Sequence, residues 1–548
     1  MRVVASYYLT VGLIFLACTG LFGFFVVNWT NPVSLIQFSL LIFFTFSFAL
    51  TFVKRLFSLF LRPNPPSNLQ GLEGGPSVAV LYTTMNDVVP ECLERIDQSH
   101  AVDVYVLDDS TDLTKRRMVD ALCASKGFTI LRREERVGYK AGAINDWLEK
   151  YGFRYDYFVL LDADSILPRD WVGECLKYAE HPDNRYVAIF QGLINIWNLD
   201  NNFTSTLAPI HRLSQDEWEK KLANHLDAVL FYGHNALLRT RPVIDAGGFP
   251  VNFVSEDYAL AVRLADRGYT CRFVPLHTFE ALPENVRGFV RRQNKWTRGA
   301  MEFFGFARRS KISPARKLTL LEVPLGHVSY LCMLAAMFLA IYGANSSLKS
   351  SVVFVSSFLA SPVIFILSIP LFRYTFFLAI VSAIITGLKL VQVRLSPIRY
   401  WRFQILSRSI GGIMLPHEAR AILYYLFNRT KRFPVTPKNE PPLGVRDVFS
   451  LAWMTILYTL VLVLGISLLN PVGLFYNIGW ILPLATAPFI IYHFSTPGDS
   501  QATSRLQLDM LQATSVEPKL GQRPLWQTRR GWPWKASRVG ETKTSQER

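Results

Sequence analysis

The sequence predicts an α/β domain with a mostly parallel sheet, inserted between α-helical transmembrane segments. Half of the 548 residues are hydrophobic, and they gather in stretches of about 20 residues, the length that spans a bilayer core. A long polar stretch separates the second apolar segment from the third. Within that stretch, short β-prone runs alternate with helix-like ones, the pattern of a parallel sheet with covering helices.

Seven hydrophobic segments have the composition of membrane helices. They lie near residues 4–27, 33–57, 319–343, 351–372, 375–393, 448–470 and 474–494. The first is followed at once by another span, so we interpret it as an uncleaved helix and not as a signal peptide. Three segments between the polar domain and the next basic loop would put the two on opposite sides. We therefore expect one of the pair divided by Phe372-Arg373-Tyr374 to be re-entrant, which leaves six crossings.

Charge is distributed as in a multi-pass membrane protein. The loop 392–438 carries nine Lys or Arg and one acid, whereas the links 28–32 and 471–473 carry no charge. The positive-inside rule places this loop, the polar domain and both termini in the cytosol, with the chain in the plasma membrane. The net charge of +16 belongs to the membrane flanks, which argues against a nucleic-acid partner.

Two further features limit the class of protein. The six cysteines include no CxxC pair, which argues against a disulfide framework and a structural zinc site. The tail 496–548 is polar and basic and lacks apolar periodicity, so we expect it to be disordered. Regulation would then come from the membrane or from an accessory subunit.

Polar side chains follow three β-prone runs of the polar domain. They are Thr83, Asp108 with Asp109, and Asp162 with Asp164. Because ligands bind beyond the carboxyl ends of parallel strands, we expect these side chains to share one crevice. Asp162 and Asp164 suit a hard cation that also binds phosphate oxygens. An Asp-rich turn is the alternative interpretation of this pair alone.

Two other places carry charged groups suited to the same crevice. Lys140 beside Gly142 supplies a cation near a flexible turn, as diphosphate binding requires, or is a solvated surface lysine. Glu256 and Asp257 follow Ser255 at the start of a helix-like run. They either stabilise the N-terminus of that helix or supply the carboxylate base that an attacking sugar hydroxyl needs.

In order and spacing, these motifs resemble the membrane-integrated family 2 glycosyltransferases, which include cellulose, chitin, hyaluronan and bacterial glucan synthases. The motifs are Asp108-Asp109, Lys140-Ala141-Gly142, Asp162-Ala163-Asp164, Ser255-Glu256-Asp257, and Gln293 to Trp296 with Gly299. The resemblance covers about residues 1–495 and implies a GT-A-type domain over 62–286.

A further motif lies in the basic loop. Residues 433–438 read Phe-Pro-Val-Thr-Pro-Lys and fit the FxVTxK gating loop of cellulose synthases, which covers the donor pocket from the cytosol. An arbitrary basic loop would rarely reproduce four fixed residue types at these offsets. The resemblance therefore implies that Thr436 and Lys438 contact the donor.

The resemblance implies a processive, inverting β-glycosyltransferase that polymerises a UDP-sugar, UDP-glucose being favoured, and passes the polysaccharide through its own transmembrane channel. Asp257 would be the general base. The donor would be bound by Thr83, Asp108, Asp109, Lys140, Asp162, Asp164, Lys295, Thr436 and Lys438. Asp162 and Asp164 would hold Mg²⁺, or Mn²⁺ with the same ligands. The acceptor, a growing glycan, would be bound by Glu256, His234, Asn235, Gln293 and Trp296.

The sequence departs from the family pattern at one motif. The pattern is QxxRW, whereas Arg292 and Lys295 stand here at the Gln and Arg positions. Lys295 still neutralises a diphosphate as a point charge, without the bidentate fork of arginine. His234 lies in a Gly-His-Asn segment like that of glucan synthases, and a satisfied core histidine is its alternative.

The remaining chain divides around this domain. We expect two transmembrane helices in 1–61, interfacial amphipathic helices in 287–318, a transmembrane region in 319–393, a cytosolic interface helix with the gating loop in 394–445, and two transmembrane helices in 446–495. The segment 399–427 is either interfacial or packed on the soluble domain.

Two other functions compete with a polysaccharide synthase. A non-processive transferase would add one sugar to a lipid, and a catalytically inactive scaffold would retain only the fold. Five carboxylates at strand ends and a helix start favour an enzyme, because a scaffold has no chemical need for them. A pure ion channel is disfavoured, since the spans carry almost no ionisable residues.

Overall fold

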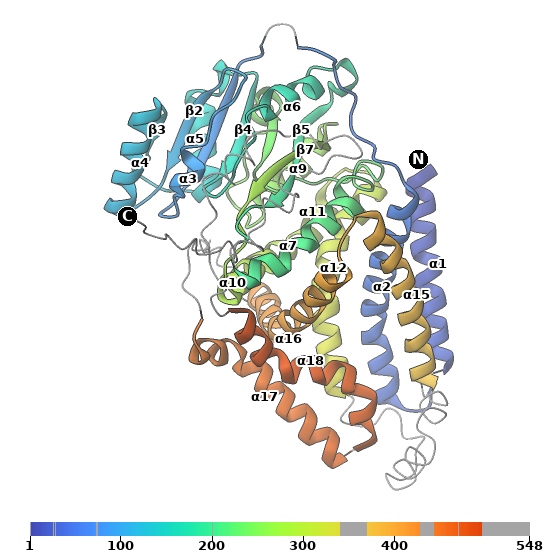
Figure 1. Ribbon diagram of the computed structural model, residues 1–548. Helices are drawn as coiled ribbons and strands as arrows, with labels where there is room; N and C mark the ends of the chain where they lie inside the picture. Colours follow the sequence, from blue (N-terminus) through green and yellow to red (C-terminus); the bar gives the residue numbers. More distant parts are fainter. Residues whose placement is uncertain are drawn as a thin grey trace, which may run out of the picture.

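A computed structural model describes residues 2–25, 27, 29–72, 75–199, 201–339, 370–427, 443–469 and 471–495. It shows a sheet-containing domain at one end of a group of long helices (Figure 1). The expected gating loop with Thr436 and Lys438, the tail 496–548 and most of the segment 351–372 lie outside the described residues.

The sheet of the described domain has seven strands in the order β3-β2-β1-β4-β6-β5-β7. Their bounds are β1 Val78–Thr84, β2 Asp103–Asp108, β3 Thr129–Leu131, β4 Tyr157–Asp162, β5 Val187–Ile196, β6 Ala236–Arg239 and β7 Thr270–Glu280. Every pair is parallel except those of β6, which is antiparallel to both β4 and β5. The predicted α/β fold with a mostly parallel sheet between apolar helices is confirmed.

Apolar side chains of the strands alternate between the two faces of the sheet. Ala79 and Leu81 of β1 join one buried cluster, and Val78, Val80 and Tyr82 join the other. Helices cover both faces. They are α3 Pro90–Leu93, α4 Leu113–Lys126, α5 Tyr139–Lys150, α6 Trp171–Ala179, α8 Thr240–Asp245 and α9 Glu256–Asp266.

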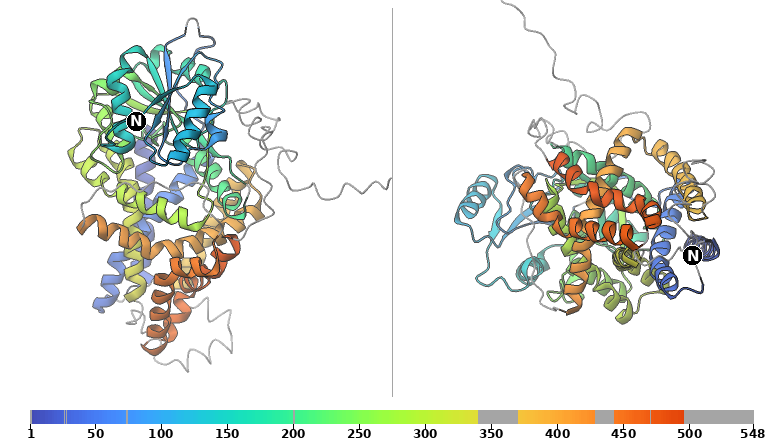
Figure 2. Two further views of the ribbon diagram at one scale, coloured as in Figure 1. Left: turned by 90° about the vertical axis from the view of Figure 1, so that its left-hand side faces the viewer. Right: turned by 90° about the horizontal axis from the view of Figure 1, so that it is seen from below.

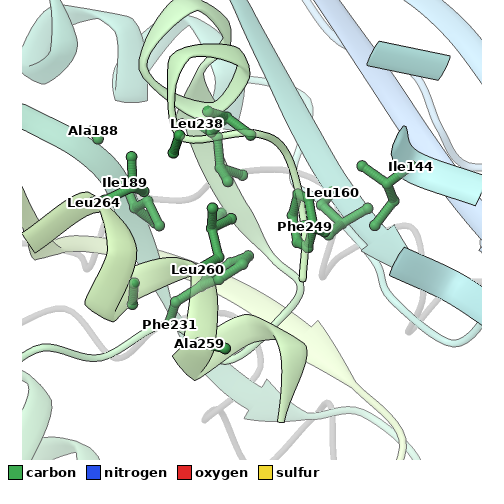
Figure 3. Packing of buried hydrophobic residues seen from close by; sticks show 14 of the residues in the cluster. Ile144, Leu160, Ala188, Ile189, Phe231, Leu238, Phe249, Ala259, Leu260 and Leu264 are labelled. Carbon is green, nitrogen blue, oxygen red and sulfur yellow. The ribbon is translucent and has the colours of Figure 1, made fainter. Parts of the chain in front are cut away.

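The first cluster fixes the two helices that carry charged site residues. Ile144 of α5 and Leu260 of α9 are fully buried and pack with Leu160 of β4 and Phe231 (Figure 3). Each fully buried aliphatic or aromatic side chain stabilises the fold by about 1.5–3 kcal/mol. The starts of α5 and α9 are thereby held beside the carboxyl end of β4.

The long apolar helices outside the sheet domain begin and end close to the hydrophobic segments predicted from the sequence. They are α1 Arg2–Phe25, α2 Pro32–Phe60, α12 Pro314–Leu339, α15 Pro370–Gln392, α17 Val445–Leu469 and α18 Pro471–Ser495. Four of the described stretches are long and apolar enough to cross a membrane, namely Arg2–Phe24, Pro32–Phe60, Pro314–Leu339 and Val445–Leu468. Shorter apolar helices run over Ile380–Gln392 and Ile481–Ser495.

The helix α15 differs from the sequence expectation. We expected two segments divided at residues 372–374, but α15 begins at Pro370 and runs through them. Proline is favoured at the first helical position, where its missing N–H leaves no hydrogen bond unmade. Residues 372–374 are therefore not a break between two segments but part of one helix.

Three helices lie between the sheet domain and the apolar helices (Figures 1 and 2). They are α10 Val286–Ala300, α11 Phe303–Arg309 and the long α16 Pro397–Phe427. The guanidinium of Arg298 in α10 lies 4.9 Å from the ring centre of Tyr424 in α16. The helix α7, Asn202–Ser214, continues into a π-helical turn, η3, Gln215–Glu219, at the same level.

Candidate active site

Three strand ends meet at one edge of the sheet, as the sequence predicts. Thr83 of β1 is opposite Asp162 of β4, and Thr84 is opposite Asp108 of β2. The Thr83 hydroxyl donates to the carbonyl of Leu161 at 3.0 Å. This register places three of the predicted site residues side by side.

Asp108 and Asp109 are each paired with an arginine that the sequence interpretation did not identify. Arg132 Nε donates to Asp108 Oδ2 at 2.8 Å, and Arg133 Nε donates to Asp109 Oδ1 at 3.2 Å. Both arginines follow β3, the neighbour of β2 in the sheet. Their position 24 residues downstream gives no local signal, because the pairing depends on how β3 lies against β2.

Arg133 also orders the loop before α5. Its guanidinium donates to the carbonyls of Val137 and Tyr139, both at 2.9 Å. Gly138, with φ of 74°, precedes the first residue of α5, and glycine adopts this left-handed conformation at no steric cost. The loop thus turns sharply just before α5, whose second residue is Lys140.

Lys140 joins two of the predicted site elements. Its ammonium is ion-paired with Asp162 and donates to the carbonyl of Gly233 at 2.8 Å. Burial alone would lower the pKa of Lys140, but Asp162 and the more distant Glu256 and Asp257 carboxylates raise it. Lys140 is therefore a fixed cation, suited to an anionic ligand.

The two carboxylates of the Asp162-Ala163-Asp164 motif face different surroundings. Asp162 keeps 37% of its side chain exposed, whereas Asp164 is buried and accepts a hydrogen bond from the amide of Ala281 at 3.3 Å. No group of three or more His, Cys, Asp or Glu that could hold a metal ion occurs among the described residues. The oxygen chemistry of the pair still fits a divalent cation whose other ligands are phosphate oxygens.

Glu256 and Asp257 lie at the first turn of α9. The turn before them is held by Glu302, whose carboxylate accepts from the amides of Val254 and Ser255 at 3.0–3.1 Å. Asp257 Oδ1 accepts from the amide of Tyr258 at 2.8 Å. Burial and the neighbouring Glu256 raise the pKa of Asp257 to about 7.

The helix α10 packs against the turn that begins α9. A β carbon at Gly299 would contact the Ser255 hydroxyl, so the two segments approach closely at this glycine. Burial lowers the pKa of Lys295, which the charges of Glu256 and Asp162 oppose. Lys295 thus lies near the same carboxylates as Lys140.

The other predicted residues of α10 differ in exposure. Trp296 is 50% exposed, and the guanidinium of Arg292 lies 4.6 Å from its ring centre. Gln293 is half-buried. An exposed indole braced by an arginine is a suitable apolar platform for a sugar ring.

His234 lies in the middle of the charged groups. Its Nε2 is 2.7 Å from Glu280 Oε2, and its Nδ1 is 3.7 Å from Asp162 Oδ2. Burial would lower the pKa of His234, but the two carboxylates raise it to about 9. The imidazolium in turn overcomes the effect of burial on Glu280 and lowers its pKa to about 2. Glu280, at the end of β7, is a site residue that the sequence interpretation missed.

Asn235 is fully buried, unlike the other predicted acceptor residues. Its amide donates to the carbonyl of Phe279 at 3.3 Å, and its backbone N–H donates to Leu160 at 2.7 Å. Its φ of 53° is left-handed, which asparagine tolerates better than most residues. Asn235 therefore supports the turn that presents His234.

Comparison with known proteins gives a family match. Residues 157–387 match the family described as "Glycosyl transferase family group 2". The chain is 32% identical over 214 residues to glucomannan 4-beta-mannosyltransferase 2 of Arabidopsis thaliana, covering 37% of this chain and 39% of that protein. It is 25% identical over 317 residues to glucans biosynthesis glucosyltransferase H of Shewanella sp. (strain ANA-3), covering 50% and 41%. The chain thus spans about two fifths of the length of these curated relatives.

Solved structures resemble the chain more distantly. The mannosyltransferase PcManGT from Pyrobaculum calidifontis, in complex with GDP-Man and Mn²⁺, is 18% identical with a TM-score of 0.48, covering 73% of this chain and 100% of that chain. TarS of S. aureus is 12% identical with a TM-score of 0.28, covering 48% and 49%.

Proposed function

We propose that this chain, whose residues 157–387 match the family described as "Glycosyl transferase family group 2", is a membrane-embedded, inverting hexosyltransferase that builds a β-linked glycan. The observation that carries the proposal is the half-buried Asp257, which lies in one site with Lys140, Asp162 and Glu256. A base and a diphosphate-binding cation held together are the minimum that sugar transfer from a nucleotide donor requires.

The donor would lie across the strand ends. Thr83, Asp108 and Asp109 line the edge expected for the nucleoside, with Arg132 and Arg133 setting the positions of the two carboxylates. Lys140 of α5 and Lys295 of α10 interact with the same carboxylates and would neutralise the diphosphate. Their charge offsets the negative charge that grows on the leaving group as the bond to the sugar breaks.

Asp257 would act as the general base. It accepts the proton of an acceptor hydroxyl, whose oxygen attacks the anomeric carbon while the bond from that carbon to the diphosphate oxygen breaks. Direct displacement inverts the anomeric configuration, so an α-linked donor yields a β-linked product. A carboxylate with a pKa of about 7 is suited to the role, because a base is most effective when its pKa lies near the working pH.

A divalent cation would be held by Asp162 and Asp164. When bound, Mg²⁺ or Mn²⁺ supplies additional positive charge to the diphosphate. Lys140 is ion-paired with Asp162, so this lysine orients the carboxylate that would hold the cation and would itself contribute to charge neutralisation.

We further propose a processive reaction on the cytosolic side of the plasma membrane, with UDP-glucose as the donor and the product moving through the transmembrane helices. Support for polymer synthesis comes from the exposed Trp296 on α10, between the site and the apolar helices. The names of the relatives, a glucomannan synthase and a glucan glucosyltransferase, also support it.

The test is nucleotide-sugar turnover by the purified full chain in lipid. UDP-glucose, GDP-mannose and UDP-GlcNAc are each supplied with Mg²⁺ or Mn²⁺, and nucleotide release and product size are measured together. Asp257→Asn is compared with Asp245→Asn, a change at an exposed acid of the same domain. We expect long polymer from UDP-glucose, lost only in Asp257→Asn. A single sugar transferred to lipid would overturn processivity, and no turnover with any donor would overturn the enzyme assignment.

A further inference from the structure

The π-helical turn η3 lies between the candidate site and the helices α2 and α15. It contains three acids, Asp216, Glu217 and Glu219. π-Helical turns are rare and are frequently found at functional sites. All three acids are at least four-fifths buried, which is costly for charged groups unless each has a specific partner.

Two of the acids attach η3 to the apolar helices. Glu217 Oε1 is 2.6 Å from Arg55 of α2, whose guanidinium also donates to the hydroxyl of Thr386 in α15 at 2.9 Å. Asp216 is ion-paired with Lys389 of α15. The position of η3 is thereby fixed relative to both helices.

The third acid points the other way, toward the site. The Tyr232 hydroxyl donates to Glu219 Oε1 at 3.1 Å. Tyr232 begins the turn that continues with Gly233 and His234, and its amide donates to Gln191 Oε1 of β5 at 3.0 Å. Gln191 therefore holds the backbone of this turn, and Glu219 holds its first side chain.

The turn lies against four charged groups of the site. The carbonyl of Gly233 accepts from Lys140 at 2.8 Å, and a β carbon at Gly233 would lie 3.0 Å from Asp257 Oδ2. His234 faces Asp162 and Glu280. A shift of Tyr232 would therefore move the supports of the proposed base and of the diphosphate-binding lysine.

We infer that Glu219 is a positioning residue: through the Tyr232 hydroxyl it holds the 232–234 turn against Asp257 and Lys140, in a fixed relation to α2 and α15. The inference rests on the proposed function. It assigns no contact with substrate to Glu219. The apolar helices α2 and α15 thus help to set the geometry of the site through the hydrogen bond between Tyr232 and Glu219.

The surroundings of Glu219 support this role. Its second oxygen, Oε2, is buried without a hydrogen-bond partner among the described residues, so Tyr232 is the main constraint on the carboxylate. Burial raises the pKa of Glu219 to about 7. The ionisable groups that face it are Tyr232, Tyr258 of α9, Lys54 of α2 and the neighbouring Glu217.

The test uses Glu219→Ala, Tyr232→Phe and the double variant, with Glu149→Ala and the exposed Tyr186→Phe as matched controls. Turnover, binding of the nucleoside diphosphate, and hydrogen exchange of the 232–234 amides are measured in lipid. We expect each single change to lower kcat about tenfold, which is the effect of raising the activation free energy by the net energy of one hydrogen bond. The double variant should be no slower than either single one, because both changes remove the same bond.

Further readouts separate positioning from a general loss of structure. Faster exchange confined to the 232–234 amides, with nucleotide affinity changed less than about threefold, and recovery of turnover in Glu219→Gln are expected. Additive losses in the double variant, or unchanged amide exchange, would overturn the inference. If Glu219→Ala does not fold, Tyr232→Phe still decides, since it removes one oxygen atom. If the wild type has no turnover, the proposed function fails, and amide exchange still tests the positioning.

Discussion

Gly233 lies directly against the carboxylate of Asp257. A β carbon at Gly233 would lie 3.0 Å from Oδ2 and 3.3 Å from the β carbon of Asp257. The φ of Gly233 is +79°, a conformation that other residues adopt only with strain. The proposed base, Asp257, can therefore lie this close to the facing turn because Gly233 has no side chain.

The first prediction compares Gly233→Ala with Gly247→Ala. Gly247 has a φ of +81°, but a β carbon there would meet nothing within 4 Å. Both changes should destabilise the fold by about 1 kcal/mol through backbone strain. Only Gly233→Ala should also displace Asp257 and lower kcat by about a hundredfold, the scale of a lost general base. Equal losses of kcat in the two variants would contradict this arrangement.

The second prediction concerns the cation of α5. Lys140→Met should weaken binding of the nucleoside diphosphate about tenfold or more, because a hydrogen bond to a charged group contributes about 1.5–3 kcal/mol. Lys150→Met is the control, since Lys150 lies on the same helix with 56% of its side chain exposed. Isothermal titration with the diphosphate measures both. Unchanged affinity in Lys140→Met would remove this lysine from the donor site.

The third prediction is a pH dependence of kcat/KM. Asp257 must be ionised to accept a proton, and its pKa is raised to about 7, so kcat/KM should rise as the pH increases through about 7 and then level off. Glu256 contributes to that shift by its negative charge. Glu256→Gln should therefore move the inflection to lower pH. An inflection that stays in place would mean that another group titrates, or that the two acids do not interact.

Periodicity and local motifs predicted the outline of this fold because both signals are local. Apolar runs of four or five residues predict the strand ends that carry Thr83, Asp108 and Asp162. The register of the parallel strands then brings these residues together. The start of α9 was equally visible, since Asp257 lies at the first turn of a helix-like run. Lys140 and Gly142 were expected at a flexible turn, but both lie in the first turn of α5.

The partners of these residues were not predictable in the same way. Arg133 reaches Asp109 because β3 lies beside β2. Glu280 at the end of β7 reaches His234, which precedes β6, across the single strand β5 that lies between β6 and β7. Such pairs depend on the strand order, and the antiparallel β6 between β4 and β5 has no marker in its short sequence. The charged groups were thus identifiable one by one, but their neutralising partners were not.

The fourth prediction concerns the acceptor side. Trp296→Ala should shorten the product without weakening donor binding, because the half-exposed indole of Trp296 on α10 is expected to contact the acceptor sugar and not the nucleotide. Trp401→Ala, a change at another exposed tryptophan, on α16, is the control. Product size by gel filtration and diphosphate affinity by titration separate the two effects. If Trp296→Ala lowered the diphosphate affinity as well as the product size, Trp296 would belong to the donor site.

The fifth prediction is that Asp257→Asn stabilises the protein at alkaline pH while it abolishes turnover. The pKa of Asp257 is raised from 3.8 to about 7 in the folded protein, so the folded state binds this proton more tightly than the unfolded state. The resulting stabilisation is fully present below pH about 4 and is lost as the pH rises to about 7. Above pH 7 the half-buried, ionised carboxylate is a net cost to the fold.

Asparagine has nearly the same shape and carries no charge, so Asp257→Asn removes that cost. The Tm of the variant should exceed that of the wild type at pH 8, by roughly 2–4 °C for each kcal/mol recovered, and the difference should shrink toward pH 5. Thermal unfolding in lipid at several pH values measures it, with Asp245→Asn as the exposed control. A difference in Tm that does not depend on pH would show that Asp257 is not held in the folded protein with a raised pKa, and the proposed base would then need another source of its proton affinity.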